Sequence, residues 1–154
     1  MIQRVLADHS TWAPAPAKFE AGTPHIAGVL GMQAAFEYLA ACDLEAHGSR
    51  ELKLARDLVG ELKKDKDISL YNSLDADDSV AIVSFYHKKI HPHDMAQMCD
   101  SFGVCIRAGH HCAQPLMKNW QVAATSRVSF YLYNDSQDVE KFLLAYDKAK
   151  KTFC

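Results

Sequence analysis

The stretch Val80-Ala81-Ile82-Val83-Ser84-Phe85 is a short run of β-branched and apolar residues, which predicts a β-strand at the centre of the chain. A similar run, Ile68-Ser69-Leu70-Tyr71, comes before it, and the polar segment 72–79 separates the two. On the N-terminal side of both runs, the apolar residues follow a helical period instead. We therefore expect helices followed by a small sheet.

Two helices are expected before the first strand. The first runs from Ile26 to Ala41, with apolar residues near one face. The second runs from Ser49, its expected N-cap, to Lys64. The residues expected to form its buried stripe are Leu52, Ala55, Leu58, Val59 and Leu62.

The sequence after Phe85 alternates between short helical and extended segments. We expect a helix over 94–102, opened by His91 or His93, a strand over 104–106, a helical turn over 115–120 and a strand over 127–132. A last helix, capped by Asp135 or Ser136, should end near Lys151 and bury Val139, Phe142, Leu143, Tyr146 and Ala149. The predicted fold class is α+β, with helices covering a small, mainly antiparallel sheet.

Composition excludes several classes of protein. The chain has 154 residues, 49% hydrophobic and 23% charged, which is typical of a globular domain. A net charge of -2 gives no basic surface for nucleic acid, and no apolar run approaches the roughly 20 residues that cross a bilayer. An odd count of 5 cysteines and the lack of a signal pattern favour free thiols in the cytoplasm. Cys99 and Cys105 are expected in the core.

The run Arg107-Ala108-Gly109-His110-His111-Cys112-Ala113-Gln114-Pro115-Leu116 carries the candidate chemistry. It places one cysteine beside two imidazoles and a guanidinium, within a turn that contains Gly and Pro. Cationic and hydrogen-bonding neighbours favour the thiolate, which is the nucleophilic form of cysteine. Cys112 is therefore the candidate nucleophile. The alternatives are a buried structural cysteine and histidines that only satisfy loop carbonyls.

This run resembles the active-site loop of the group II cysteine desulfurases of the SUF iron–sulfur assembly pathway, in the class V aminotransferase family. Three further blocks match that family in its order, namely Phe19-Glu20-Ala21-Gly22-Thr23-Pro24, His91-Pro92-His93-Asp94 and the segment 124–134. The resemblance implies the small C-terminal domain of a fold-type I pyridoxal phosphate enzyme. Residues 1–24 would be an extended arm from the end of the large domain, and residues 25–154 the linking helix and the small domain.

The same resemblance implies pyridoxal 5'-phosphate as the cofactor of the complete enzyme, bound to a lysine in a Ser-x-His-Lys segment. No segment of this sequence matches it, and Met1-Ile2 falls where the family's large domain closes. We therefore expect no cofactor on this chain alone, and expect it to be inactive without a cofactor-binding domain or chain. The implied reaction converts L-cysteine to L-alanine and leaves a persulfide on the enzyme.

Site roles follow from the resemblance, residue by residue. Cys112 matches the attacking cysteine, and Arg127 matches the arginine that binds the substrate carboxylate. Arg107 would stabilise the thiolate or the substrate charge, although a structural role in the loop is an equal alternative. His110 and His111 would assist proton movement or only pack and hydrogen-bond in the loop.

Gly22 and Thr23 match the segment that reaches the cofactor phosphate of the neighbouring subunit, whereas His25 replaces an asparagine common in the family. His93 matches a histidine near the docking surface for the SUF sulfur acceptor; helix capping by His93 or Asp94 is the alternative. No resident metal is expected, because the histidines and Cys112 lack the close ligand pairs typical of zinc sites.

The resemblance implies a homodimer in the complete enzyme. Two other functions stay open for the chain itself. One is a persulfide carrier that works without the cofactor, with Cys112 receiving sulfur made elsewhere. The other is a non-catalytic interaction domain.

Overall fold

The structure, a computed structural model, describes residues 1–71, 74 and 79–154. The chain divides into two compact units, Met1–Cys42 and Asp43–Cys154, which we describe separately. Among the described residues, none of the helices combines the length and the apolar character needed to span a bilayer.

The first unit begins with a β-hairpin. Strand β1 (Ile2–Val5) pairs antiparallel with β2 (Ser10–Trp12), and the Leu6 N–H donates to the His9 carbonyl across the turn at 2.8 Å. A short 3₁₀ helix, η1 (Ala17–Phe19), follows. We expected extended chain with one edge strand here. The second strand was missed because it has only three residues.

The rest of the first unit is helix α1 (Ile26–Ala40), whose apolar residues lie around its circumference and not near one face as predicted. None of its residues is buried, and apolar side chains such as Val29, Leu30 and Phe36 are more than half exposed. A helix that is apolar around its circumference is typical of a position covered by other protein.

The second unit begins with helix α2 (Leu44–Leu62), which starts five residues before the expected N-cap. Ser49 is inside the helix, and the true N-cap is Asp43, whose carboxylate accepts from the Ala46 N–H at 3.0 Å. The predicted stripe is also corrected at one position. Leu54 is buried in place of Leu52, which is only half-buried.

A four-stranded antiparallel sheet follows, in the order β3-β4-β6-β5. Its strands are β3 (Ile68–Leu70), β4 (Ile82–His87), β5 (Arg107–Gly109) and β6 (Thr125–Ser129). The expected loop 72–79 lies largely outside the described residues. In β4 the side chains alternate, with Val83, Phe85 and His87 buried on one face.

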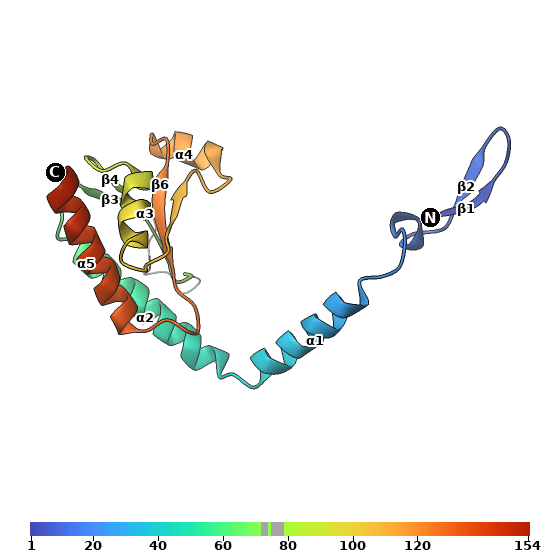
Figure 1. The fold of residues 1–154 in the computed structure, drawn as a ribbon, viewed down its shortest axis with the longest axis horizontal. Coiled ribbons are helices and arrows are strands. Elements are labelled where there is room, and N and C mark those ends of the chain that lie inside the picture. Colours follow the sequence, from blue (N-terminus) through green and yellow to red (C-terminus); the bar gives the residue numbers. More distant parts are fainter. Residues whose placement is uncertain (72–73, 75–78) are drawn as a thin grey trace. The chain divides into compact units, whose positions relative to one another are not determined.

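Helices α3 (Pro92–Asp100), α4 (Gln114–Trp120) and α5 (Ser136–Phe153) complete the unit. In Figure 1, α3 and α5 lie beside each other. Phe85 of β4 meets Phe142 of α5 edge to face, so that helix covers the buried side of the sheet. Asp135 caps α5 through a capping box, so the first of the two alternatives, Asp135 or Ser136, is the N-cap. The predicted α+β fold with an antiparallel sheet covered by helices is confirmed.

The edge strand β5 corrects two predictions. The strand expected over 104–106 is in fact at Arg107–Gly109, because pairing with β6 starts only at the Arg107–Arg127 pair. Cys105 is exposed instead of buried, since its segment precedes β5 and lies outside the sheet. Cys99, on α3, is fully buried as predicted.

Two smaller predictions also need correction. Leu143 is only half-buried, and Ala145 takes its place among the buried residues of α5. Helix α3 is capped by His91, whose Nδ1 accepts from the His93 N–H at 3.3 Å, so neither His93 nor Asp94 is the cap.

Candidate active site

Cys112 lies in a tight turn between the edge strand β5 and helix α4. The turn closes through a hydrogen bond from the Ala113 N–H to the His110 carbonyl at 2.8 Å. Its two central residues, His111 and Cys112, have φ of 55° and 58°. This left-handed conformation costs an L-residue about 1 kcal/mol or more, so other contacts must hold the turn. The Cys112 side chain is exposed, which leaves its thiol accessible.

Three side-chain contacts hold this turn. The Cys112 N–H donates to Nδ1 of His110 at 3.1 Å. Nε2 of His111 lies 3.0 Å from the Thr125 hydroxyl on β6. The Arg107 guanidinium donates to the Cys112 sulfur at 3.9 Å. The thiol is thus next to a positive charge, in a loop fixed to the sheet by a neighbouring strand.

The strand register brings the two candidate arginines together. Arg107 and Arg127 are direct partners in the β5–β6 ladder, so their side chains are on the same face of the sheet. That face is opposite the one that carries Val128, which packs into the core. Thr125 lies two residues before Arg127 and shares its face. The predicted residues Cys112, Arg107 and Arg127 therefore form one cluster.

Two buried nitrogen atoms of this cluster lack a hydrogen-bond partner among the described residues, namely Nδ1 of His111 and Nε of Arg127. Buried polar groups without partners are uncommon in folded proteins. Burial, followed by the positive charge of Arg127, holds the pKa of His111 below its usual value. His111 is therefore a neutral imidazole at neutral pH, with one ring nitrogen available to a further group.

The other predicted site residues are elsewhere. Gly22 and Thr23 belong to the first unit, where both are exposed and Gly22 has φ of 80°. His25 precedes α1 without a capping hydrogen bond from its side chain. His93 is exposed in the first turn of α3 and stacks on His91, with ring centroids 5.3 Å apart. Within the described part of the chain, neither a hydrogen bond nor an ion pair joins His93 to the Cys112 turn.

Thr125 also belongs to this cluster, although the sequence did not indicate it. It is fully buried, and its hydroxyl anchors His111. The period of a β-strand could have indicated Thr125, because the residue two positions before Arg127 lies on the same face of the strand as Arg127. The partner of that hydroxyl could not be inferred from the sequence, since His111 reaches it only in the left-handed turn.

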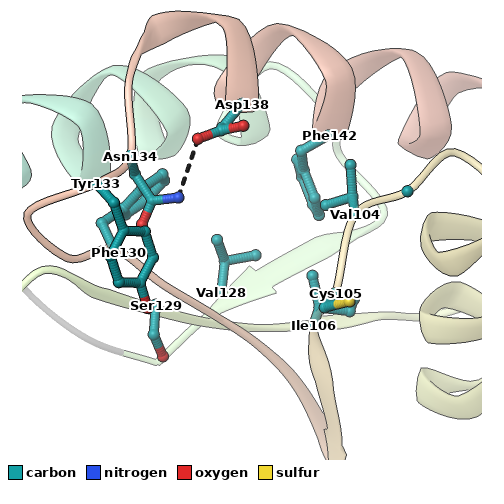
Figure 2. A pocket seen from close by; sticks show the side chains of 11 residues that line it. Val104, Cys105, Ile106, Val128, Ser129, Phe130, Tyr133, Asn134, Asp138 and Phe142 are labelled. Carbon is teal, nitrogen blue, oxygen red and sulfur yellow. Dashed lines mark hydrogen bonds between the residues drawn. The ribbon is translucent and has the colours of Figure 1, made fainter.

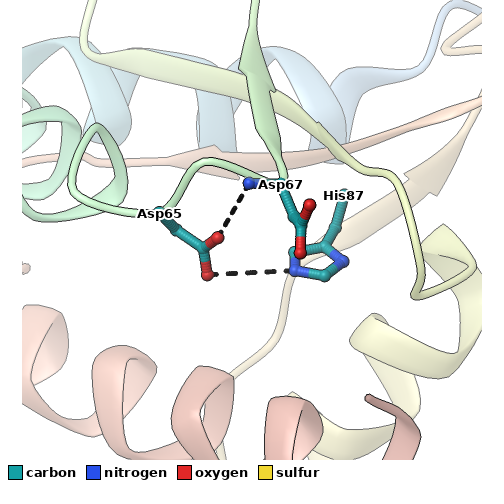
Figure 3. A group of neighbouring side chains, drawn as sticks. All are labelled: Asp65, Asp67 and His87. Atoms are coloured by element: carbon teal, nitrogen blue, oxygen red, sulfur yellow. Dashed lines mark hydrogen bonds and ion pairs between the residues drawn. The ribbon is translucent and has the colours of Figure 1, made fainter.

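A second polar cluster joins the loop between α2 and β3 to β4 and α5, on the core side of the sheet. Asp65, Asp67 and His87 bring their ligand-type atoms within 4.8 Å of one another (Figure 3). Lys150 pairs with Asp65 at 2.6 Å, and Lys89 pairs with Asp67 at 2.7 Å. Because both carboxylates already face an ammonium group, we interpret the cluster as an ion-pair network that connects these elements.

A cavity of about 290 Å³ lies between the segment that precedes β5 and the end of β6. Val104, Cys105 and Ile106 line one side of it (Figure 2). The hydrogen bond from Asn134 to Asp138, at 2.9 Å, lies across the cavity from them. Its lining does not include Cys112 or either arginine of the cluster, so the cavity is distinct from the candidate active site.

The sequence is similar to curated proteins described as probable cysteine desulfurases. The protein from Halalkalibacterium halodurans is 40% identical over 153 residues, which cover 99% of this chain and 37% of that protein. The protein from Xylella fastidiosa is 40% identical over 151 residues, 98% of this chain and 36% of its own length. The chain thus spans little more than a third of these relatives.

Solved structures give the same result. The S-sulfonic acid form of the cysteine desulfurase CsdA from Escherichia coli matches all of this chain with a TM-score of 0.86 and 35% identity, and the match covers 38% of that structure. The apo cysteine desulfurase from Thermococcus onnurineus matches 99% of the chain with a TM-score of 0.84 and 33% identity, again over 38% of that structure. The family model for aminotransferase class-V matches residues 1–142, and the chain belongs to this family.

Proposed function

We propose that this chain supplies the persulfide-forming thiol of a pyridoxal phosphate-dependent cysteine desulfurase, which converts L-cysteine to L-alanine. One observation carries the proposal. The exposed Cys112 lies in a left-handed turn, with its sulfur 3.9 Å from the Arg107 guanidinium. An accessible thiol beside a fixed positive charge is the arrangement that favours a reactive thiolate.

Arg127 is proposed to bind the substrate carboxylate. Its Nε is buried and has no partner among the residues that the structure describes, so the side chain has a donor available for a ligand. A planar guanidinium binds a carboxylate through two parallel hydrogen bonds, which fixes the orientation of the substrate. Arg107 is its strand partner and contacts the sulfur, so a carboxylate on Arg127 would place the substrate close to Cys112.

The residues of this chain fit only part of the proposed cofactor. Thr23 offers an exposed hydroxyl, and Gly22 a backbone without a side chain, for a phosphate group. None of the residues assigned to the Cys112 cluster is a lysine, so the Schiff-base amine must come from elsewhere. Pyridoxal phosphate, when bound, withdraws electrons from the substrate and so weakens its carbon–sulfur bond.

In the proposed step, the Cys112 thiolate attacks the sulfur of the bound cysteine. The new S–S bond forms as the C–S bond breaks, and the electron pair of the C–S bond stays with carbon, which then takes up a proton to give alanine. Neutral His111 can hold a proton next to this reaction through its unpartnered Nδ1. Arg107 stabilises the thiolate before the attack.

We propose that the 154-residue polypeptide alone is inactive, because it offers no lysine at this site. The complete enzyme is proposed to be a homodimer in the cytoplasm that passes the persulfide to an acceptor of the SUF pathway. Exposed His93 is proposed to contact that acceptor. The proposed division into an arm, residues 1–24, and a domain, residues 25–154, belongs to the same hypothesis.

A chimera tests the function. The part of the H. halodurans relative that precedes its matched region is fused to these 154 residues, and alanine release from L-cysteine is measured by chromatography. We expect alanine from the chimera and none from the 154-residue polypeptide alone. Cys112→Ala should remove turnover, whereas Cys154→Ala, a matched change at another exposed cysteine, should not. Equal turnover by the Cys112→Ala chimera would disprove the proposal.

The exposure of Cys112 also favours a second function, that of a persulfide carrier. Incubation of the 154-residue polypeptide with a complete desulfurase and L-cysteine would then add about 32 Da to Cys112, the mass of one sulfur atom. Absence of this adduct would exclude the carrier function.

A further inference from the structure

The backbone of Cys112 is held by the side chain of His110, two residues before it. The Cys112 N–H donates to Nδ1 of His110 at 3.1 Å. This bond spans two residues, like the bond in turns where an Asn or Asp side chain accepts from the N–H two residues later. Nδ1 can accept only when it carries no proton, so the bond requires the His110 tautomer that has its proton on Nε2.

The conformation of Cys112 makes this bond important. A non-glycine residue with φ of 58° is disfavoured, and His111 before it is in the same region. The Ala113 N–H bond to the His110 carbonyl closes the turn, and Thr125 anchors the His111 ring. Neither contact involves the backbone of Cys112. Among the described residues of the site, His110 is the one whose side chain forms a hydrogen bond with the Cys112 backbone.

We propose that His110 is a positioning residue, whose Nδ1 holds the Cys112 backbone in the left-handed conformation and so directs the sulfur toward Arg107. The inference rests on the proposed function only for its consequence in catalysis. It assigns to His110 a role different from that of His111, which is bonded to the strand and has an unpartnered nitrogen.

Substitutions at His110 separate the acceptor from the ring. In His110→Asn, the side-chain oxygen can still accept the N–H two residues later, whereas His110→Phe keeps a ring without an acceptor. His110→Ala is a second variant without an acceptor, for use if the Phe variant does not fold. His9→Phe, at an exposed histidine of the hairpin unit, is the matched control.

Two measurements are made on the full chain without cofactor, namely the alkylation rate of Cys112 by iodoacetamide and the hydrogen exchange of the Cys112 amide. Exposed Cys105 and Cys154 serve as internal references. Loss of one hydrogen bond corresponds to a change of about 3- to 10-fold. We expect this increase in amide exchange, and a decrease in alkylation of similar size, for His110→Phe and His110→Ala. His110→Asn and His9→Phe should stay within about 2-fold of the wild type.

Unchanged exchange and alkylation in both variants without an acceptor would overturn the proposal. Faster exchange with an unchanged alkylation rate would also overturn it, because the bond would then not position the thiol. A loss in His110→Asn equal to that in His110→Phe would also overturn the proposal, because a side-chain acceptor at this position would then not be sufficient to hold the Cys112 backbone. None of these results depends on desulfurase turnover, so an inactive chimera would leave this inference intact.

Discussion

Replacement of Asp65 by Asn tests the ion-pair network beneath the sheet. One carboxylate oxygen of Asp65 accepts from the Asp67 N–H at 2.9 Å. The other accepts from the Tyr146 hydroxyl at 2.7 Å and from Lys150 at 2.6 Å. An amide has only one oxygen, so Asp65→Asn must place its NH₂ group against a donor in either orientation. The isosteric change therefore removes hydrogen bonds without creating a cavity.

The expected cost follows from these contacts. A buried donor left without its acceptor costs about 1–3 kcal/mol, and Lys150 loses a charged partner that is partly screened by solvent. We expect the free energy of unfolding to fall by about 2 kcal/mol, which corresponds to a decrease in Tm of about 8 °C for a domain of this size. Asp57→Asn, at an exposed pair with Lys53, is the control and should change the free energy by less than about 0.5 kcal/mol.

The assay is thermal unfolding followed by Trp120 fluorescence, in a Trp12→Phe background so that only the second unit is observed. Trp120 stacks on Tyr71 with ring centroids 4.5 Å apart, so its emission reports that unit. A Tm of Asp65→Asn equal to that of the Asp57→Asn control would show that the contacts of Asp65 do not stabilise the second unit.

The effect of Asp65 should depend on pH. Burial alone would raise the pKa of this carboxyl, but the hydrogen bonds from Lys150 and Tyr146 outweigh burial and hold the pKa well below its usual value. The unfolded chain therefore binds a proton more readily, and the stabilisation is present above about pH 4 and is lost as the pH falls below that value. The difference between wild type and Asp65→Asn should narrow over the same range.

Three further predictions concern the thiols and the core. Arg107→Met should slow alkylation of Cys112 by about 2- to 5-fold, whereas Arg107→Lys, which keeps the charge, should not; peptide mass spectrometry measures both rates. Cys99 should resist alkylation at pH 8 until the protein unfolds, because burial raises its pKa to about 12; labelling with and without denaturant measures this. Leu54→Ala should reduce the free energy of unfolding by about 2–5 kcal/mol, and Leu52→Ala by clearly less, as measured by denaturant titration.

The predicted elements exist in the expected order, but the strand expected over 127–132 lies at Thr125–Ser129. The other errors occurred where one local signal competed with another. In α2, Ser49 indicated a helix start, but Asp43 already caps the backbone and the helix continues through Ser49. The choice between Leu52 and Leu54 depends on the rotation of the helix over the sheet, which tertiary packing determines. The apolar segment 104–106 has the composition of a strand, but in the described ladder between β5 and β6 the pairing begins only at Arg107.

Part of the candidate site could be predicted from the sequence, and part could not. The residue types at Cys112, Arg107 and Arg127 suggested nucleophile and anion-binding chemistry, and the β5–β6 register brings them together. The roles of these residues remain predictions. The left-handed turn could not be predicted, because neither His111 nor Cys112 is glycine and their conformation depends on bonds from His110 and Thr125.

The two polar clusters of this unit differ in how completely their groups are paired. At Asp65, both oxygens have donors and the nearby ammonium group balances the charge, so the cluster needs nothing further. Next to Cys112, Arg127 and His111 each keep a buried nitrogen without a partner among the described residues. In that part of the chain, none of the ion pairs places a carboxylate on either guanidinium group. A fold stabilised only by its own contacts would be expected to satisfy these donors. The unpaired nitrogens and the two guanidinium groups therefore agree with the proposed binding of a substrate carboxylate beside the Cys112 sulfur.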